Sequence, residues 1–205
     1  MRALVLLVIS GLAMPLSLHA RDTTVDHGRW TDEYDPYFKK YTKRYFGPAF
    51  DWRWFKGQAI AESNLRPNIK SDAGAVGLMQ ILPSTYREIQ QSNPHFKDIR
   101  DPQWNIAAGI YYDRQLYRKW QKPVSDKDRL LLSLASYNAG YGRIRKAYKR
   151  AEAKDEALQG WQNIQTYVPG ETRFYVNRID NLVTGREQKK IRRLRGIEKY
   201  LAKNP

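Results

Sequence analysis

The chain has 205 residues, no cysteine, three histidines and a formal net charge of +15 at pH 7. Its length suits one compact domain with short extensions, and the absence of cysteine excludes disulfides, thiolate catalysis and thiolate metal sites. So few histidines disfavour a histidine-based zinc site or a Ser-His-Asp triad, and the positive charge predicts an anionic partner.

Residues 1–20 have the pattern of a secretory signal peptide. Arg2 precedes an uncharged apolar run that ends at the small-residue cleavage signal Leu18-His19-Ala20. The alternative is a membrane anchor, but Met14-Pro15 and the short run argue against a span, which needs about 20 apolar residues. We therefore expect cleavage after Ala20 and an exported protein that acts in the periplasm or cell envelope.

The N-terminal part of the mature chain predicts a lead-in followed by two helices. Residues 21–33 are polar and are expected to form a flexible lead-in to a domain over 34–185. Gly47-Pro48 separates the helices, and the second one is capped by Asp51 and runs to about Ser63. One face of the first helix is aromatic at helical spacing, which is typical of core packing, through Tyr34, Phe38, Tyr41 and Tyr45.

The middle of the chain reads as a loop followed by three helices. Residues 67–82 are rich in glycine and polar residues, and at most a small β-hairpin is expected there. Helices are predicted over 84–91 and 104–120. The third helix begins with a capping box, Ser125 to Asp128, and ends at Gly140 in a left-handed cap. The fold is therefore expected to be mainly α.

The C-terminal part is basic. A basic helix is predicted to begin after Gly142 and run through Arg150, followed by a loose loop or insertion over 151–170 and a last helix from Glu171 to Gly185. Residues 186–205 form a basic tail with eight Lys or Arg against two Glu. Its apolar residues fall at helical spacing, so it is expected either to lie on an anionic membrane surface or wall polymer, or to be a solvated tail that packs weakly on the domain.

Glu62 is the carboxylate whose position is most suggestive of chemistry. It ends a mostly apolar helix directly before the glycine-rich loop. Burial and the negative end of the helix dipole would both raise its pKa, which keeps a carboxyl protonated near neutral pH as a general acid requires. On spacing alone, however, a capping or ion-paired glutamate is the more common explanation.

Several further sequence blocks change that weighting. Glu62-Ser63 is followed in order by Ser71, by Gly74 to Ile81, by Asp101 to Gly109, by Ser136-Tyr137-Asn138-Ala139-Gly140 and by Glu171 to Val176. Over roughly residues 34–180, this order resembles the family 1 lytic transglycosylases of the lysozyme-like superfamily. Several ordered blocks are far more specific than one short motif. The departures, Ser136 where Ala is usual and Leu82 where Met is common, are mild.

The resemblance implies a lysozyme-like, bilobal helical domain and a set of functional residues. It assigns Glu62 as the single catalytic acid and base. The implied substrate-binding residues are Ser63, Ser71, Met79, Gln80, Tyr137, Asn138, Glu171 and Tyr175. The implied substrate is the glycan strand of peptidoglycan, and neither a metal nor a cofactor is expected. The protein could also act with a secretion or envelope machine. It is expected to be a monomer.

A single carboxylate suffices if the substrate supplies its own nucleophile. Most glycosidases use two carboxylates. The sequence offers no compelling second one, because Asp98, Asp101 and Asp113 look like caps or surface groups. The family reaction instead closes a 1,6-anhydro ring on N-acetylmuramic acid, and such an intramolecular attack needs no bound water.

Three alternatives remain. The first is a goose-type lysozyme-like hydrolase that uses the same carboxylate with water as nucleophile. The second is an inactive wall-binding scaffold, against which the retained Glu62, Gln80 and Asn138 argue. The third is nucleic-acid binding, suggested by charge alone and disfavoured because the charge gathers in the tail and no nucleic-acid-binding motif is present.

Overall fold

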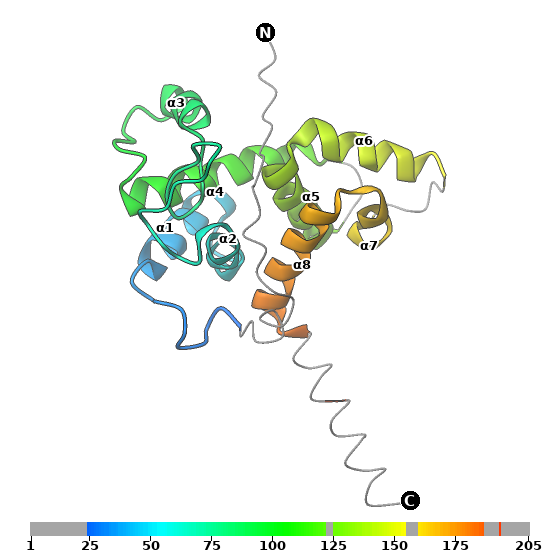
Figure 1. The fold of residues 1–205 in the computed structure, drawn as a ribbon, viewed down its shortest axis with the longest axis horizontal. Helices are drawn as coiled ribbons and strands as arrows, with labels where there is room; N and C mark the ends of the chain where they lie inside the picture. The colour runs from blue at the N-terminus through cyan, green and yellow to red at the C-terminus, as the bar shows by residue number, and fades with distance from the viewer. Residues whose placement is uncertain (1–23, 122–124, 155–159, 187–192, 194–205) are drawn as a thin grey trace, which may run out of the picture.

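A computed structural model describes residues 24–121, 125–154, 160–186 and 193. The predicted signal peptide and nearly all of the basic tail lie outside the described residues. Within the described part, the chain forms eight α-helices, a 3-10 turn and no named β-strand. Figure 1 shows how these elements are arranged. The prediction of a mainly α fold is confirmed.

The helix bounds follow the predicted order closely. The helices are α1 Asp35–Phe46, α2 Arg53–Ser63, α3 Pro83–Ser92, α4 Pro102–Lys119, α5 Asp126–Ala139, α6 Tyr141–Glu152, α7 Trp161–Ile164 and α8 Gly170–Thr184, with the 3-10 turn η2 at Gln165–Tyr167. The helices α3 and α4 both begin with a proline. The first N–H groups of a helix have no partner within it, so the missing N–H of proline costs no hydrogen bond there.

Two hydrophobic cores divide the helices into two lobes. The first core gathers residues of α1 to α4, with Phe38, Phe55 and Ile106 fully buried, and the second gathers residues of α5 to α8. Figure 1 shows these two groups side by side, with α4 running between them. Ile110 of α4 belongs to the first core and Tyr117, two turns later, to the second.

Helices α2 and α8 come from different lobes and pack closely. A Cβ atom on Gly57 of α2 would lie 3.2 Å from Cγ2 of Val183 and 3.5 Å from Cγ2 of Ile179, both on α8. A larger residue would push the helices apart, so the glycine allows their close approach. This contact brings the C-terminal half of α2 beside α8.

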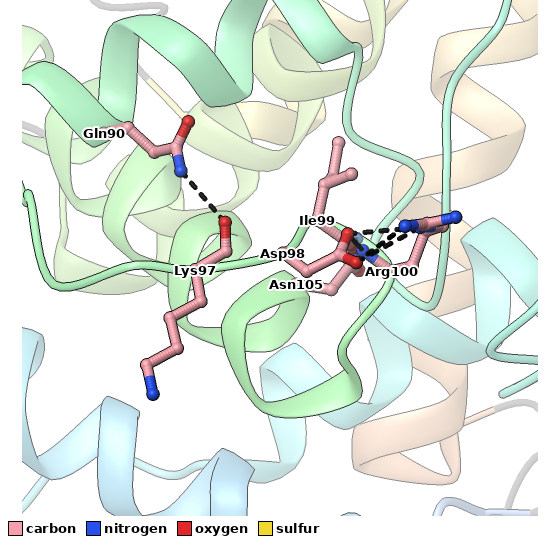
Figure 2. A network of polar contacts seen from close by, with 6 residues as sticks. All are labelled: Gln90, Lys97, Asp98, Ile99, Arg100 and Asn105. Carbon is pink, nitrogen blue, oxygen red and sulfur yellow. Dashed lines mark hydrogen bonds and ion pairs between the residues drawn. The ribbon is translucent and has the colours of Figure 1, made fainter.

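Asn105 of α4 anchors the glycine-rich loop. Its amide nitrogen donates to the carbonyls of Val76 and Ile99, both at 2.9 Å, and its amide oxygen accepts from the Met79 N–H at 2.8 Å. Figure 2 shows Asn105 beside Ile99 and the Asp98–Arg100 ion pair. The loop contains two isolated antiparallel β-bridges, Lys70 to Val76 and Val76 to Ile81. They lie where a small β-hairpin was predicted.

The connection after α3 is held by a side chain of that helix. Gln90 Nε2 donates to the carbonyl of Lys97 at 3.0 Å, as Figure 2 shows, and also to that of Phe96. This bond ties the segment that leads into α4, and hence the position of Asn105, to α3.

Three local predictions differ from the structure. Asp51 accepts from the Arg53 N–H at 3.0 Å, but Trp52 occupies the N-cap position of α2. Gly140 has a positive φ of 85° with an extended ψ of 134°, so it is not a left-handed cap. The helix α6 starts directly after Gly140, at Tyr141, so the predicted start after Gly142 is two residues late.

The predicted loose loop over 151–170 is wrong in its second half. Residues 161–167 form α7 and η2, and Trp161, Ile164 and Val168 are buried in the second core. Their spacings of three and four were a usable helical signal. The lead-in also packs on the domain, because Val25 and Trp30 are buried and the Val25 N–H donates to the carbonyl of Leu182 at 3.0 Å.

None of the helices in the described part of the chain is both long enough and apolar enough to cross a bilayer.

Candidate active site

Glu62 lies in the last turn of α2, facing α8. Part of its side chain reaches solvent, yet its carboxyl is densely surrounded by protein. Burial raises the pKa of this carboxyl to about 7, and a hydrogen bond from Tyr175 opposes the rise. Burial is the larger effect because the charged form loses its hydration. Close to neutral pH the group can therefore both give and take a proton.

Tyr175 of α8 is the direct partner of Glu62. Its hydroxyl donates to Glu62 Oε1 at 2.7 Å. Burial and the charge of Glu62 raise the pKa of the tyrosine well above its ordinary value, so the hydroxyl stays a donor. The bond leaves Glu62 Oε2 available to carry a proton.

The chain reverses sharply after Glu62. Asn64 and Leu65 both have positive φ, 52° and 57°, a conformation that non-glycine residues rarely adopt. The Ser63 hydroxyl lies 2.9 Å from the carbonyl of Leu78 and 3.0 Å from that of Ala59. Ser63 is buried, and these contacts tie the end of α2 to the glycine-rich loop.

Met79 and Gln80 lie in that loop and are held by it. Met79 is fully buried against Gly109 of α4, where an added Cβ would lie 2.8 Å from its side chain. Gln80 has a positive φ of 46°, and its amide donates to the carbonyls of Gly77 at 2.9 Å and Ile69 at 3.3 Å. An unusual backbone at a non-glycine residue is typical of functional sites.

Tyr137 and Asn138 lie in the last turn of α5. The Tyr137 hydroxyl donates to the carbonyl of Met79 at 2.7 Å. Burial raises the pKa of this hydroxyl well above its ordinary value, and the charge of Glu62 adds to the rise. Asn138 Oδ1 accepts from the Thr172 hydroxyl of α8 at 2.7 Å. Thus α2, α5, α8 and the loop meet around Glu62, and Thr172 is a member of this set that the sequence did not single out.

Ser71 and Glu171, two of the predicted substrate-binding residues, form no direct polar contact with Glu62. Ser71 Oγ accepts from the Ala75 N–H at 3.0 Å and stabilises the turn of the loop. Glu171 is exposed in the first turn of α8. Neither has a hydrogen bond or ion pair with Glu62 in the structure, so their assignment still rests on the resemblance.

Asp113 of α4 is the residue that sequence analysis misjudged. It was expected to be a cap or surface group, but it is fully buried and accepts from Gln58 Nε2 at 3.4 Å. Burial raises its pKa well above the ordinary value, and the charge of Glu62 adds to the rise. Its place on the apolar face of α4, with Ile106, Ile110 and Tyr117 at helical spacing, was the signal that could have identified it.

Possible metal ligands were also considered. Across the described segments, no group of three or more His, Asp or Glu side chains is placed to hold a metal ion.

Comparison with known families identifies the domain. The family model described as the transglycosylase SLT domain matches residues 37–159, which is more than half of the chain. The chain belongs to the transglycosylase SLT domain family. The match includes Glu62, the glycine-rich loop, and Tyr137 and Asn138.

Curated relatives of this SLT domain include several proteins that share one name. Membrane-bound lytic murein transglycosylase F of Vibrio cholerae is 30% identical over 152 residues, covering 74% of this chain and 26% of the relative. The same-named protein of Shewanella woodyi is 30% identical over 132 residues. The opening blocks Tyr34-Asp35-Pro36 and Phe50 to Arg53 predict this resemblance to lytic transglycosylase F, which the relatives confirm.

Solved structures share the fold of the SLT domain. The 70 kDa soluble lytic transglycosylase of Escherichia coli is 28% identical with a TM-score of 0.59, covering 74% of this chain and 23% of that one. An inactive mutant of the lytic transglycosylase Slt of Pseudomonas aeruginosa is 24% identical with a TM-score of 0.64, covering 78% and 25%. The chain thus spans about a quarter of the length of these relatives.

Proposed function

We propose that the chain is an exported peptidoglycan lytic transglycosylase that cleaves the β-1,4 bond between N-acetylmuramic acid and N-acetylglucosamine without water. The observation that carries the proposal is the Glu62 carboxyl, whose burial and bond to Tyr175 give it a pKa of about 7 within an SLT domain. The names of the relatives support the same substrate and reaction class.

In the first step, the protonated Glu62 gives its proton to the glycosidic oxygen. The C1–O bond breaks, N-acetylglucosamine leaves as an alcohol, and positive charge develops at C1 of the muramic acid. The N-acetyl group of that sugar stabilises the charge. Tyr175 stabilises the carboxylate that forms, because its hydroxyl already points at Oε1.

In the second step, the Glu62 carboxylate accepts the proton of the C6 hydroxyl of the same muramic acid. The C6 oxygen attacks C1 and closes the 1,6-anhydro ring, which returns the proton to Glu62. One carboxyl with a pKa near the working pH serves as acid and then as base. The nucleophile belongs to the substrate, so its effective concentration is high without a second carboxylate.

The remaining site residues are proposed to bind and shape the glycan site. Gln80 and Asn138 carry amides that suit N-acetyl groups and hydroxyls. Met79, Tyr137 and Ser63 act through packing and hydrogen bonds that fix the loop beside Glu62. Ser71 and Glu171 are assigned to outer contacts with the glycan on the resemblance alone.

The test is digestion of purified peptidoglycan by the protein without residues 1–20, with Glu62→Gln beside it. Mass spectrometry is expected to find muropeptides lighter by one water than reducing ones, and none with the variant. Reducing ends instead would assign a lysozyme-like hydrolase. No soluble product from folded wild-type protein would favour a wall-binding scaffold.

A further inference from the structure

Asp113 and Gln58 form a buried polar pair behind Glu62. Both side chains are fully buried, Asp113 on α4 and Gln58 on α2. Gln58 lies one turn before Glu62, and residues four apart share a helix face. The mechanism proposed above uses neither residue, although a buried carboxyl is costly to keep unless it is paired.

The hydrogen bonding of this pair is half complete. Gln58 Nε2 donates to Asp113 Oδ1 at 3.4 Å, which is long for such a bond. Asp113 Oδ2 and Gln58 Oε1 are both buried and have no hydrogen-bond partner among the described residues. Both atoms are acceptors when the aspartate is ionised, so they cannot satisfy one another in that state.

A single proton resolves both unsatisfied atoms. If Asp113 Oδ2 carries a proton, it can donate to Gln58 Oε1 while Gln58 Nε2 donates to Asp113 Oδ1. The pair then has two reciprocal hydrogen bonds and no charge. A buried polar atom without a hydrogen-bond partner destabilises the fold, so pairing two such atoms at once strongly favours the protonated form.

The surroundings of Asp113 favour the same state. The groups that interact with it are Gln58 and Glu62 of α2, Tyr137 of α5 and Tyr175 of α8, and Tyr112 is its neighbour on α4. Glu88 of α3 adds a further negative charge beside Tyr112. None of these groups is a cation. The hydrogen bond from Gln58 favours the carboxylate, but burial is the larger effect and ionised Glu62 also opposes ionisation of Asp113.

We propose that Asp113 carries a proton in the folded protein and forms a reciprocal acid–amide pair with Gln58, and that this neutral pair is a positioning element for Glu62. The pair links α4 to α2 one turn before Glu62 and fixes that helix without placing a charge near the acid. Its role for Glu62 rests on the proposed function, whereas its protonation state does not.

The protonation state is tested by carbon NMR of the folded protein labelled at the aspartate carboxyl carbons. Asp113→Asn identifies the Asp113 resonance by its disappearance. We expect that resonance to stay at the position of a protonated carboxyl from about pH 5 to 8, where ordinary aspartates are ionised. A carboxylate resonance at neutral pH would overturn the acid–amide pair, whatever the protein does to peptidoglycan.

The positioning role is tested by comparing Asp113→Asn with Asp113→Ala in peptidoglycan digestion. Asparagine can form both reciprocal bonds, so we expect kcat within about threefold of wild type and an unchanged pH midpoint on the basic side. Alanine leaves Gln58 unpaired beside a cavity, and we expect kcat to fall about tenfold or more with a smaller change in KM.

Two results would overturn the role. If Asp113→Asn moves the basic midpoint to lower pH, a negative charge at Asp113 was raising the pKa of Glu62 in the wild type. If Asp113→Asn and Asp113→Ala lose kcat equally while circular dichroism shows both folded, the reciprocal pair does not position Glu62. An inactive wild type with a protonated Asp113 resonance would instead count against the proposed function alone.

Discussion

Tyr175 and Glu62 are 113 residues apart in the sequence, yet the tyrosine hydroxyl donates to Glu62 Oε1 at 2.7 Å. The contact depends on the close approach of α2 and α8 that Gly57 permits. Burial and this hydrogen bond have opposite effects on the same carboxyl, since burial raises the pKa and the bond lowers it. The value near 7 is the balance of the two.

Removal of the Tyr175 hydroxyl should therefore move the pH profile of the reaction. In Tyr175→Phe the Glu62 carboxylate loses a stabilising donor, so its pKa rises and the loss of activity on the basic side moves to higher pH. A bond to a charged group contributes about 1.5 kcal/mol or more, so a shift of about one pH unit is expected. The measurement is kcat against pH with purified peptidoglycan.

Tyr137→Phe is the matched control for that experiment. The Tyr137 hydroxyl donates to the Met79 carbonyl and not to Glu62, so its loss should disturb the loop without lowering the stability of the Glu62 carboxylate. Equal shifts of the basic midpoint in both variants would mean that the Tyr175 bond does not set the pKa of Glu62.

Glu62 should also reduce the stability of the fold at neutral and basic pH. Its pKa is about 7 in the folded state against 4.5 in the unfolded chain, so between these values the folded state binds more protons. The free energy of unfolding contributed by this group is therefore present below about pH 4.5 and is lost as pH rises through 7. The loss is at most about 3 kcal/mol, because part of the side chain is in water.

Glu62→Gln should consequently be more stable than wild type at pH 8 and no more stable at pH 4. Urea unfolding at the two pH values measures the difference. Glu171→Gln is the control, because Glu171 is exposed and its charge is already in water. A stability gain for Glu62→Gln that is equal at both pH values would contradict the raised pKa.

The sequence was sufficient to predict α1 to α6 and α8, because their signals are local, but it missed α7 and η2. Proline and glycine mark the boundaries of α1, α3 and α4, and the apolar spacing gives their buried faces. The environment of Asp113 was not predictable in the same way, because its burial depends on α2, α5 and α8 packing around one position of α4. Glu62 and Tyr175 were selected separately, but their contact is a property of the tertiary structure alone.

Gly77 should be the least replaceable glycine of the loop. Its φ is +80°, and a Cβ atom there would lie 2.5 Å from Asn105 Nδ2, the amide that holds the loop to α4. Gly77→Ala should lower the free energy of unfolding by about 2 kcal/mol or more and reduce activity, because it displaces Asn105 and with it Met79. Thermal unfolding and peptidoglycan digestion measure the two effects.

Gly74→Ala separates backbone strain from this clash. Gly74 has nearly the same φ, +82°, but a Cβ atom there would meet nothing within 4 Å. Only the strain of about 1–2 kcal/mol is then expected, with most activity retained. Equal losses in the two variants would show that the Asn105 anchor is not what Gly77 protects.

Lys56 and Asp35 should be sensitive to single replacement and tolerant of joint replacement. Lys56 Nζ lies 2.7 Å from Asp35 Oδ1, and the side chains are 4% and 15% exposed. Lys56→Met leaves the Asp35 charge buried without its partner, so a loss of about 3–5 kcal/mol is expected, whereas Lys56→Met with Asp35→Asn removes both charges and should recover much of it. Urea unfolding of the single and double variants measures the coupling. If the losses of the two single variants add up in the double variant, the ion pair does not couple α1 to α2. Packing of its aliphatic stem would then explain why Lys56 is buried.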